Sequence, residues 1–578
     1  MAAPHVPSER SFPPPELDGF LPTDIDWNEV QEHDAAMIAE LHVLNRRTSP
    51  VRSLATGLDF PCGELAGLAR RSYDAPSIEA LEQFLTEHGT IHVPVIEGYS
   101  VAVDGVERDL ALVAATEIAA DGANHGEMSS MIYLRDQIQA AEALIKLSLA
   151  DPDHYAQEGK TGKSLLVSAL HLMSTPSQLE RFDDVIHRGA QAGQADWPQI
   201  SLYFDDLAGE RPNGWRNKQD TLQMLAYTTL TAVEQGVLNA DELADGHRRF
   251  LGSVAPLLAA VGFPRYESSG SWEEVAARRT SVLAIETALL HKLQSVSDGR
   301  YGLGFLRNVM VGHMLTEGLH ELGSRLPYES DDYDSGSVKF RDGDAALAYV
   351  LRYDLPQLLA ENNIPLAVNG GAAMSVDDIE DLVLGQLETL LDPQTNGIYR
   401  YEGDSYQRVN FHTGGVQFII KAIKRKVQHD AAVAGSEIDL DVKQSLRDKL
   451  APAGRPAAWT HPLGQVASWA SSRSRQMLEA GETTEAEQYG CIGYRFLNAM
   501  LSTVTGSDQW HAVLDTNGQY EIRQVSAYRM PECYVTYTTV DGQSFCMPSP
   551  HIPLNWSSGY APGSRRHGAS GTMSLFIA

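Results

Sequence analysis

Two carboxylates directly follow a tryptophan in the segment "GSWEEVAARR" at residues 270–279. One interpretation is a helix start, in which Ser271 is the N-cap and the acidic residues of the first turn complement the helix dipole. The other is catalytic, because an apolar wall formed by Trp272 would keep Glu273 protonated near neutral pH, as a general acid requires. The segment alone favours the cap, so the choice depends on the other motifs of the chain.

Glycoside hydrolysis needs a second carboxylate, because two carboxyl groups must flank the scissile bond, one protonated and one ionised. Near the C-terminus, Glu532 follows a proline in "RMPECY" and comes about twenty residues before the segment "PLNWSSGY". We interpret this region as a loop that carries Glu532, followed by the start of the last helix of the fold.

Five segments in a fixed order resemble the glucoamylase family, glycoside hydrolase family fifteen, and the related phosphorylase kinase α and β subunits, over roughly residues 128–562. The segments are "YLRDQ", "NGWRNKQDTLQMLAY", "SGSWEEVAARRTSVLA", "YRYEGDSY", and "PECY" through "PLNWSSGY". Each motif is weak alone, since such pairs of residues arise often by chance. Together, in this order on a helical chain, they indicate a shared sugar pocket.

The resemblance implies a role for each matched residue. Glu273 would be the general acid, Glu532 the general base that activates water, and Glu274 a contact to the neighbouring sugar. Arg135 and Asp136 would bind hydroxyls of the nonreducing-end sugar in the innermost subsite. The remaining substrate-binding residues that it implies are Tyr133, Trp215, Gln219, Asp220, Trp272, Arg400, Asp404, Tyr406 and Trp556.

Two departures and three plainer alternatives accompany these assignments. Tyr133 stands where many glucoamylases have Trp, and Cys533 follows the proposed base where Gln is usual. The plainer alternatives are a surface ion pair of Arg135 with Asp136, a loop salt bridge of Arg400 with Asp404, and a solvated Glu532.

The rest of the sequence predicts the scaffold. From about residue 129, segments with apolar residues at three- and four-residue spacing follow one another, which is typical of amphipathic helices. About a dozen helices without a fixed-period repeat favour an all-α (α/α)6 toroid over a solenoid. We therefore expect a mobile Pro-rich arm at 1–25, a small mixed N-terminal extension at 26–128 with one helix and short strands, and a six-hairpin catalytic barrel at 129–578.

Composition limits the possible partners. The chain has 578 residues, with 45 Lys and Arg against 76 Asp and Glu, and a formal net charge of -31. Such a field repels nucleic acid and anionic membranes but does not exclude a neutral sugar. Four cysteines without a C-x-x-C pair indicate neither a disulfide framework nor a zinc ribbon. An N-terminus without a cationic start and an apolar run favours a cytoplasmic location.

The predicted function is an inverting, exo-acting α-glucoside hydrolase that releases β-glucose from the nonreducing end of a small α-glucoside or oligosaccharide. Its chemistry requires no metal and no organic cofactor. The alternative is a non-catalytic carbohydrate-binding or regulatory protein of the phosphorylase kinase α and β type. The presence of both carboxylates favours the hydrolase, and a cytoplasmic location would suit trehalose or another small glucoside better than starch.

Overall fold

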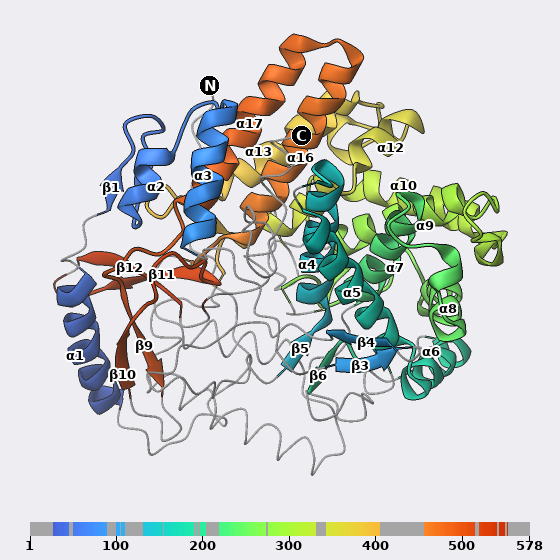
Figure 1. The fold of residues 1–578 in the computed structure, drawn as a ribbon, viewed down its shortest axis with the longest axis horizontal. Helices are drawn as coiled ribbons and strands as arrows, with labels where there is room; N and C mark the ends of the chain where they lie inside the picture. Colours follow the sequence, from blue (N-terminus) through green and yellow to red (C-terminus); the bar gives the residue numbers. More distant parts are fainter. Residues whose placement is uncertain are drawn as a thin grey trace.

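The computed structural model of the protein is built mainly of α-helices (Figure 1). The described residues are 27–45, 50–88, 100–103, 106–109, 131–153, 155–189, 192, 197–203, 219–272, 276–330, 341, 343–404, 456–514, 520–539, 541, 543–549 and 552.

An inner layer of helices forms the centre of the molecule. It contains α4 (Leu134–Ala150), α7 (Gln219–Glu234), α9 (Thr280–Val296), α11 (Ala348–Arg352) and α16 (His461–Ala480). In the described structure α4 packs on α7, α7 on α9, α9 on α11, and α11 on α16. Helix α9 is buried on every side from Thr280 to Leu290. A helix that is apolar all round needs cover on both faces, which explains the inner position of α9.

An outer layer covers these helices, and in the described structure one or two outer helices follow each inner helix along the chain. It contains α5 (Ala156–Met173), α6 (Pro176–Arg188), α8 (Asp245–Val261), α10 (Met310–Arg325), α12 (Leu355–Glu361), α13 (Val376–Thr389) and α17 (Thr483–Leu501). Helix α5 packs on α4, α10 on α9, and α17 on α16. This two-layer arrangement confirms the predicted fold class, the helical toroid. The helix predicted from "NFHTGGVQFIIKAIKRKVQHD" lies outside the described residues.

Local sequence signals set several helix ends. Ser375 caps α13, accepting a hydrogen bond from the Asp378 amide at 3.2 Å, and the Asp378 carboxylate accepts one from the Ser375 amide in return. Helix α8 ends at Gly262, whose φ of 92° an L side chain rarely adopts. The segment "DAALAYVLRYDLPQLLAE", whose apolar spacing is typical of one helix, is instead divided into the 3-10 turn η6 (Ala345–Leu347), α11 and α12. The division falls at Asp354, which has a φ of 55°.

A four-stranded sheet near the C-terminal part is the main departure from an all-helical barrel. Its order is β12 (Ser544–Pro548), β11 (Cys533–Thr538), β8 (Ala458–Trp459) and β7 (Ile398–Tyr399), with every pair antiparallel. A hairpin of β9 (Trp510–Leu514) and β10 (Tyr520–Gln524) completes this part. The segment after Glu532, which we expected to be a loop, is therefore the strand β11.

The N-terminal part is mixed, as predicted. Its elements are α1 (Trp27–Asn45), β1 (Val51–Arg52), β2 (Asp59–Phe60), α2 (Gly63–Leu68), α3 (Ala75–Glu87), β3 (Ser100–Val103) and β4 (Val106–Asp109), followed by β5 (Met131–Tyr133) and its partner β6 (Ser201–Tyr203). Helix α3 and the β3–β4 pair lie where a helix and short strands were expected, but the prediction of one helix at 26–128 is wrong, because α1 and α2 are helices as well. Helix α1 lies along β9 and β12 (Figure 1). The Tyr73 hydroxyl donates to Asn498 Oδ1 at 2.7 Å, so residues before 88 pack against C-terminal elements.

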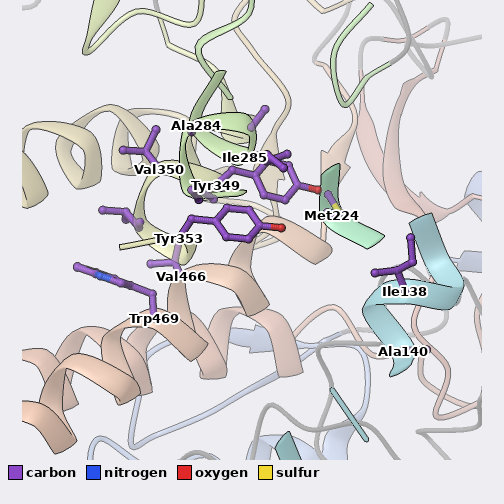
Figure 2. Close-up of a cluster of buried hydrophobic side chains, with 14 of the residues drawn as sticks. Ile138, Ala140, Met224, Ala284, Ile285, Tyr349, Val350, Tyr353, Val466 and Trp469 are labelled. Atoms are coloured by element: carbon purple, nitrogen blue, oxygen red, sulfur yellow. The ribbon is translucent and has the colours of Figure 1, made fainter. Parts of the chain in front are cut away.

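The hydrophobic core joins the inner helices to one another. Figure 2 shows Tyr349 and Tyr353 among apolar residues of the neighbouring inner helices, including Ile285 and Val466. The two tyrosine rings are stacked, with centroids 6.1 Å apart. Gln139 donates to the Tyr349 hydroxyl at 3.3 Å, so a polar contact crosses this core from α4 to α11.

Candidate active site

The N-terminal ends of the inner helices converge on one buried cluster. Arg135 lies in the first turn of α4 and Asp220 in the first turn of α7. His461 is the first residue of α16, and Asp344 directly precedes the η6–α11 segment. All four side chains are buried. Parallel inner helices therefore bring together residues that are far apart in the sequence.

Arg135 joins three segments of the chain. Its Nη1 donates to the Ser271 carbonyl oxygen at 2.7 Å, and its Nη2 donates to Asp220 Oδ1 at 3.2 Å. Arg135 is 5% exposed and Asp220 0%, so this is a fully buried ion pair. Asp136 is also buried. The alternative of a surface ion pair between Arg135 and Asp136 is therefore wrong.

Trp272 is fixed at its indole nitrogen. Its Nε1 donates to Asp344 Oδ1 at 2.5 Å, and Arg341 Nη1 donates to the other oxygen of Asp344 at 2.9 Å. The Trp272 ring packs against Trp459 with centroids 5.4 Å apart, and lies edge to face with His461 at 5.3 Å. The indole therefore has a defined position in the cluster.

Arg400 forms a bidentate ion pair inside this aromatic group. Its Nε and Nη2 donate to the two carboxylate oxygens of Asp404 at 2.7 and 2.6 Å. Its guanidinium carbon is also 5.3 Å from the ring centroids of both Trp272 and Trp459. The alternative of a salt bridge between Arg400 and Asp404 is thus confirmed, and this salt bridge is part of the cluster.

Glu532 is buried at the start of β11. It is 5% exposed, so the alternative of a solvated residue is wrong. The next residue, Cys533, pairs with Trp459 of β8. Burial raises the pKa of the Cys533 thiol, the Glu532 charge raises it further, and the Arg400 charge opposes this increase. Glu532 and Arg400 therefore act on the same buried thiol, which places both near Trp459.

Two buried carboxyl groups lie behind the cluster. Glu329 accepts hydrogen bonds from the Ser281 amide at 3.0 Å and from the Ser281 hydroxyl at 2.6 Å. Burial, and then the nearby Asp344, raise the Glu329 pKa to about 8. The Tyr266 hydroxyl donates to Glu286, whose pKa burial also raises to about 8. Both groups are therefore protonated at neutral pH.

His461 is neutral for a related reason. Burial lowers its pKa well below the ordinary value, and the positive charges of Arg135, Arg352 and Arg400 lower it further. The imidazole at the start of α16 is therefore an uncharged ring that packs against Trp272.

The helix-cap interpretation of residues 270–279 is wrong. Helix α9 begins at Thr280 with Arg279 in the N-cap position, so Ser271 lies eight residues before the cap. Ser268 and Ala277 form an antiparallel bridge, and Ser271 and Trp272 lie in a loop rather than in a helix. The loop turns at Gly270, whose φ is 67°. Trp272 therefore belongs to a loop at the mouth of the inner helices, which propensity and dipole arguments could not distinguish from a helix start.

Several predicted site residues lie outside the described residues. They are Trp215, Glu273, Glu274, Tyr406 and Trp556. Gln219 begins α7, but its side chain is also outside the described part. Tyr133 is described, is buried at the end of β5 and directly precedes α4.

The sequence analysis missed four members of the cluster: Arg341, Asp344, Trp459 and His461. Asp344 had a recognisable signal, because an aspartate before an apolar helical pattern is a common N-cap, and it accepts from the Ala346 amide at 2.8 Å. Trp459 and His461 come from "AWTHP", in which Pro462 marks the first turn of α16. Neither signal indicates a sugar site without the contacts to Trp272.

Within the described residues, no three His, Cys, Asp or Glu side chains are grouped so that they could hold a metal ion. No helix among the same residues has the length and apolar character needed to cross a membrane.

Comparisons with known proteins give structural similarity only. No family model matches the sequence, and no curated protein matches it. A glycosidase variant in complex with glucose has a TM-score of 0.45 and 14% identity, and the match covers 87% of this chain and 98% of that chain. The glucoamylase from Saccharomycopsis fibuligera has a TM-score of 0.43 and 13% identity, with coverage of 88% and 96%. Hormoconis resinae glucoamylase has a TM-score of 0.47 and 10% identity, with coverage of 87% and 73%.

Proposed function

We propose that the protein is an inverting, exo-acting α-glucoside hydrolase that releases β-glucose from the nonreducing end of a small α-glucoside. The observation that best supports this is the convergence of the motifs. Arg135, Trp272 and Arg400 come from separate motifs and lie in one buried network of contacts. Purely structural roles would not require separate motifs to meet at one end of the inner helices.

Two carboxyl groups would carry out the reaction. Glu273 protonates the glycosidic oxygen, while Glu532 takes a proton from water on the opposite face of the sugar. Inversion requires the two carboxyl groups to be separated by about 6.5–9.5 Å, so that the water fits between the base and the anomeric carbon. Glu532 would be held for this task by the first residues of β11, which pair with β8.

The indole of Trp272 would raise the pKa of Glu273, the proposed general acid. Because Asp344 accepts a hydrogen bond from Nε1, the ring is held in one orientation directly before Glu273 in the chain. An apolar ring beside a carboxyl group disfavours the ionised form and raises its pKa, which keeps a general acid protonated.

Arg135 and Asp136 would bind hydroxyl groups of the terminal sugar. The ion pair between Arg135 and Asp220 limits the positions that the guanidinium can adopt. Such pre-organisation lowers the entropy cost of holding a substrate in a reactive position. Arg400, fixed by Asp404, would serve the same purpose on another side of the pocket.

The second candidate is a non-catalytic sugar-binding or regulatory protein of the phosphorylase kinase type. The buried Arg400–Asp404 pair favours it to some degree, because a bidentate pair stabilises a loop with or without a substrate. Binding of a sugar without turnover distinguishes this candidate from the hydrolase.

The test is release of glucose from maltose, isomaltose, kojibiose, nigerose and trehalose, with NMR detection of the anomer formed first. We expect β-glucose from at least one of them, and loss of release in Glu273→Gln and in Glu532→Gln. Glu317→Gln, an exposed substitution on α10, is the matched control and should retain the wild-type rate. Wild-type rates in both site variants would overturn the assignment, and calorimetric binding without release would favour the regulatory candidate.

A further inference from the structure

A cavity of about 420 Å³ lies at the other end of the inner helices. Its walls come from the last turns of α4, α7 and α9, the end of α11 and the second half of α16. Arg135 begins α4 in the candidate active site, and Lys146 lines the cavity eleven residues later, roughly 16 Å along the helix axis at 1.5 Å per residue. The cavity is therefore separate from that site, and its volume is typical of a small-molecule site.

The cavity is positively charged in a strongly acidic protein. Four basic and two acidic side chains line it, which leaves a formal charge of +2, whereas the whole chain has a net charge of -31. The basic residues are Lys146, Lys292, Arg352 and Arg475, and the acidic ones are Glu142 and Glu234. A concave surface of one sign focuses the field and attracts small ions of the opposite sign.

The two carboxylates do not neutralise all four cations. Glu142 accepts from Lys146 at 2.7 Å and also pairs with Arg352. Glu234 pairs with Lys292 at 2.5 Å. In the described part of the chain Arg475 has no carboxylate partner, although it is on the same wall.

The helix dipole does not account for Arg475. Cations in the last turn of a helix complement its negative end, but Lys146 and Lys292 lie four residues before the ends of α4 and α9, so the dipole does not account for them either. Arg475 is five residues before the end of α16 at Ala480, beyond the last turn where this effect operates. Arg475 is exposed, so its guanidinium is accessible to a ligand that enters the cavity from solvent.

The neutral residues of the wall supply an apolar face and hydrogen-bonding groups. The Tyr227 and Tyr353 rings meet edge to face, with centroids 4.8 Å apart, and burial raises the Tyr227 pKa, so its phenol is uncharged. The hydroxyl oxygens of Thr228 and Thr231 are buried and have no hydrogen-bond partner within the described structure. Between them, Thr229 donates to the Leu225 carbonyl oxygen at 2.7 Å, as helical threonines often do.

We propose that this cavity is a second binding site, for a small organic anion that combines a phosphate or carboxylate group with hydroxyl groups. Arg475 and Lys292 hold the anionic group. The Tyr227 ring contacts the apolar face of the ligand, and rotation about χ1 brings the Thr228 or Thr231 hydroxyl within reach of its oxygens. This proposal does not depend on the proposed hydrolase activity.

Isothermal titration calorimetry of the full chain tests the proposal, with glucose 6-phosphate and glucuronate as anionic probes and glucose as the neutral probe. We expect saturable binding of at least one anionic probe, weakened tenfold or more in Arg475→Gln. Arg495→Gln on α17 removes an exposed cation outside the cavity wall and is the matched control, so it should bind as the wild type does.

Three results would overturn the proposal. The first is no saturable binding of either anionic probe, and the second is glucose binding as tightly as both of them. The third is equal weakening by Arg475→Gln and Arg495→Gln, which would attribute the binding to the overall charge of the protein rather than to the cavity.

Discussion

The two ends of the inner helices differ in how their cations are paired with carboxylates. At the N-terminal end, each of three buried arginines has its own carboxylate: Arg135 with Asp220, Arg341 with Asp344, and Arg400 with Asp404. At the C-terminal end, the cavity has more cations than carboxylates. The Lys146 and Glu234 side chains there are also 35% and 31% exposed.

The difference in charge pairing indicates two kinds of site. Fully paired buried charges cannot move without a large cost, so they fix the positions of the groups around them. Partly exposed and unbalanced charges leave room for a ligand to complete the pairing. This difference supports the two proposals, catalysis at the first end and binding of an anion at the second.

The largest expected effect is on kcat, which a substitution at the N-terminal end should lower and one at the cavity should not. Glu532→Gln should lower kcat by about 10²–10⁴-fold, because general base catalysis contributes that much to a rate. Glu234→Gln in the cavity wall should change kcat by less than about twofold, within the scatter expected of a residue that takes no part in proton transfer. Steady-state kinetics on the best substrate measures both variants, and equal losses would contradict the division of the molecule into two functional ends.

The next largest expected effect is on the free energy of unfolding. Asp220→Asn leaves the buried Arg135 guanidinium without its counter-charge and should lower the free energy of unfolding by about 3–5 kcal/mol. Glu234→Gln breaks a partly exposed pair with Lys292 and should cost about 1 kcal/mol or less. Urea denaturation followed by circular dichroism gives both values, and similar losses would show that the N-terminal pairs are not tighter than those of the cavity.

A smaller expected loss of stability tests the hydrogen bond that holds the Trp272 indole. Trp272→Phe removes the donor to Asp344 and should lower the free energy of unfolding by about 1–3 kcal/mol more than the same change at Trp469. Trp469 is equally buried, and its Nε1 has no hydrogen-bond partner in the described structure, so it controls for lost packing. Denaturation curves of the two variants provide the measurement. Equal losses would mean that the hydrogen bond contributes little.

A further effect is a dependence of stability on pH, with opposite signs at the two ends. Glu329 has a pKa of about 8, above the ordinary 4.5, so its contribution is complete below pH 4.5 and is lost as the pH rises through 8. Glu142 has a pKa lowered to about 2 by Arg352 and Lys146, so its contribution is present above pH 4.5 and is lost as the pH falls through 2. The slope for one such group is about 1.4 kcal/mol per pH unit.

Two variants separate these contributions. In Glu329→Gln, the free energy of unfolding should fall less steeply as the pH rises from 4.5 to 8. In Glu142→Gln, it should fall less steeply as the pH drops below 4.5. Urea denaturation at a series of pH values provides the comparison. An unchanged alkaline decline in Glu329→Gln would remove this residue as its source and leave Glu286, whose pKa is also about 8.

The sequence predicted elements better than it predicted contacts. Apolar spacing predicts α10, because its buried residues Val311, Leu315, Leu319 and Leu322 recur at three- and four-residue spacing. The same spacing missed β11, because six residues beside a proline and a cysteine carry too short a pattern to separate a strand from a loop. It also placed the start of α9 too early, because Ser271 fits an N-cap in composition while the chain at Gly270 turns into a loop.

The candidate site was accessible to sequence reasoning only in part. The resemblance singled out Arg135, Asp220 and Arg400, which the structure shows in the buried cluster. It did not pair Arg135 with Asp220, because that contact depends on two helices side by side rather than on adjacent residues. The cavity had no sequence signal at all, since its cations come from separate helices that only packing brings together.

The short strand β8 holds two segments that are distant in the sequence at a fixed separation. Residues Ala458–Trp459 are flanked by β7 on one side and β11 on the other, so neighbours of Arg400 and Glu532 are tied to the same two residues. Neighbouring strands lie about 4.8 Å apart whatever the length of the connections between them. Insertions or deletions between these strands would therefore leave the separation of β7 and β11 unchanged, so the residues next to Arg400 and Glu532 keep their spacing while the connecting segments vary in length.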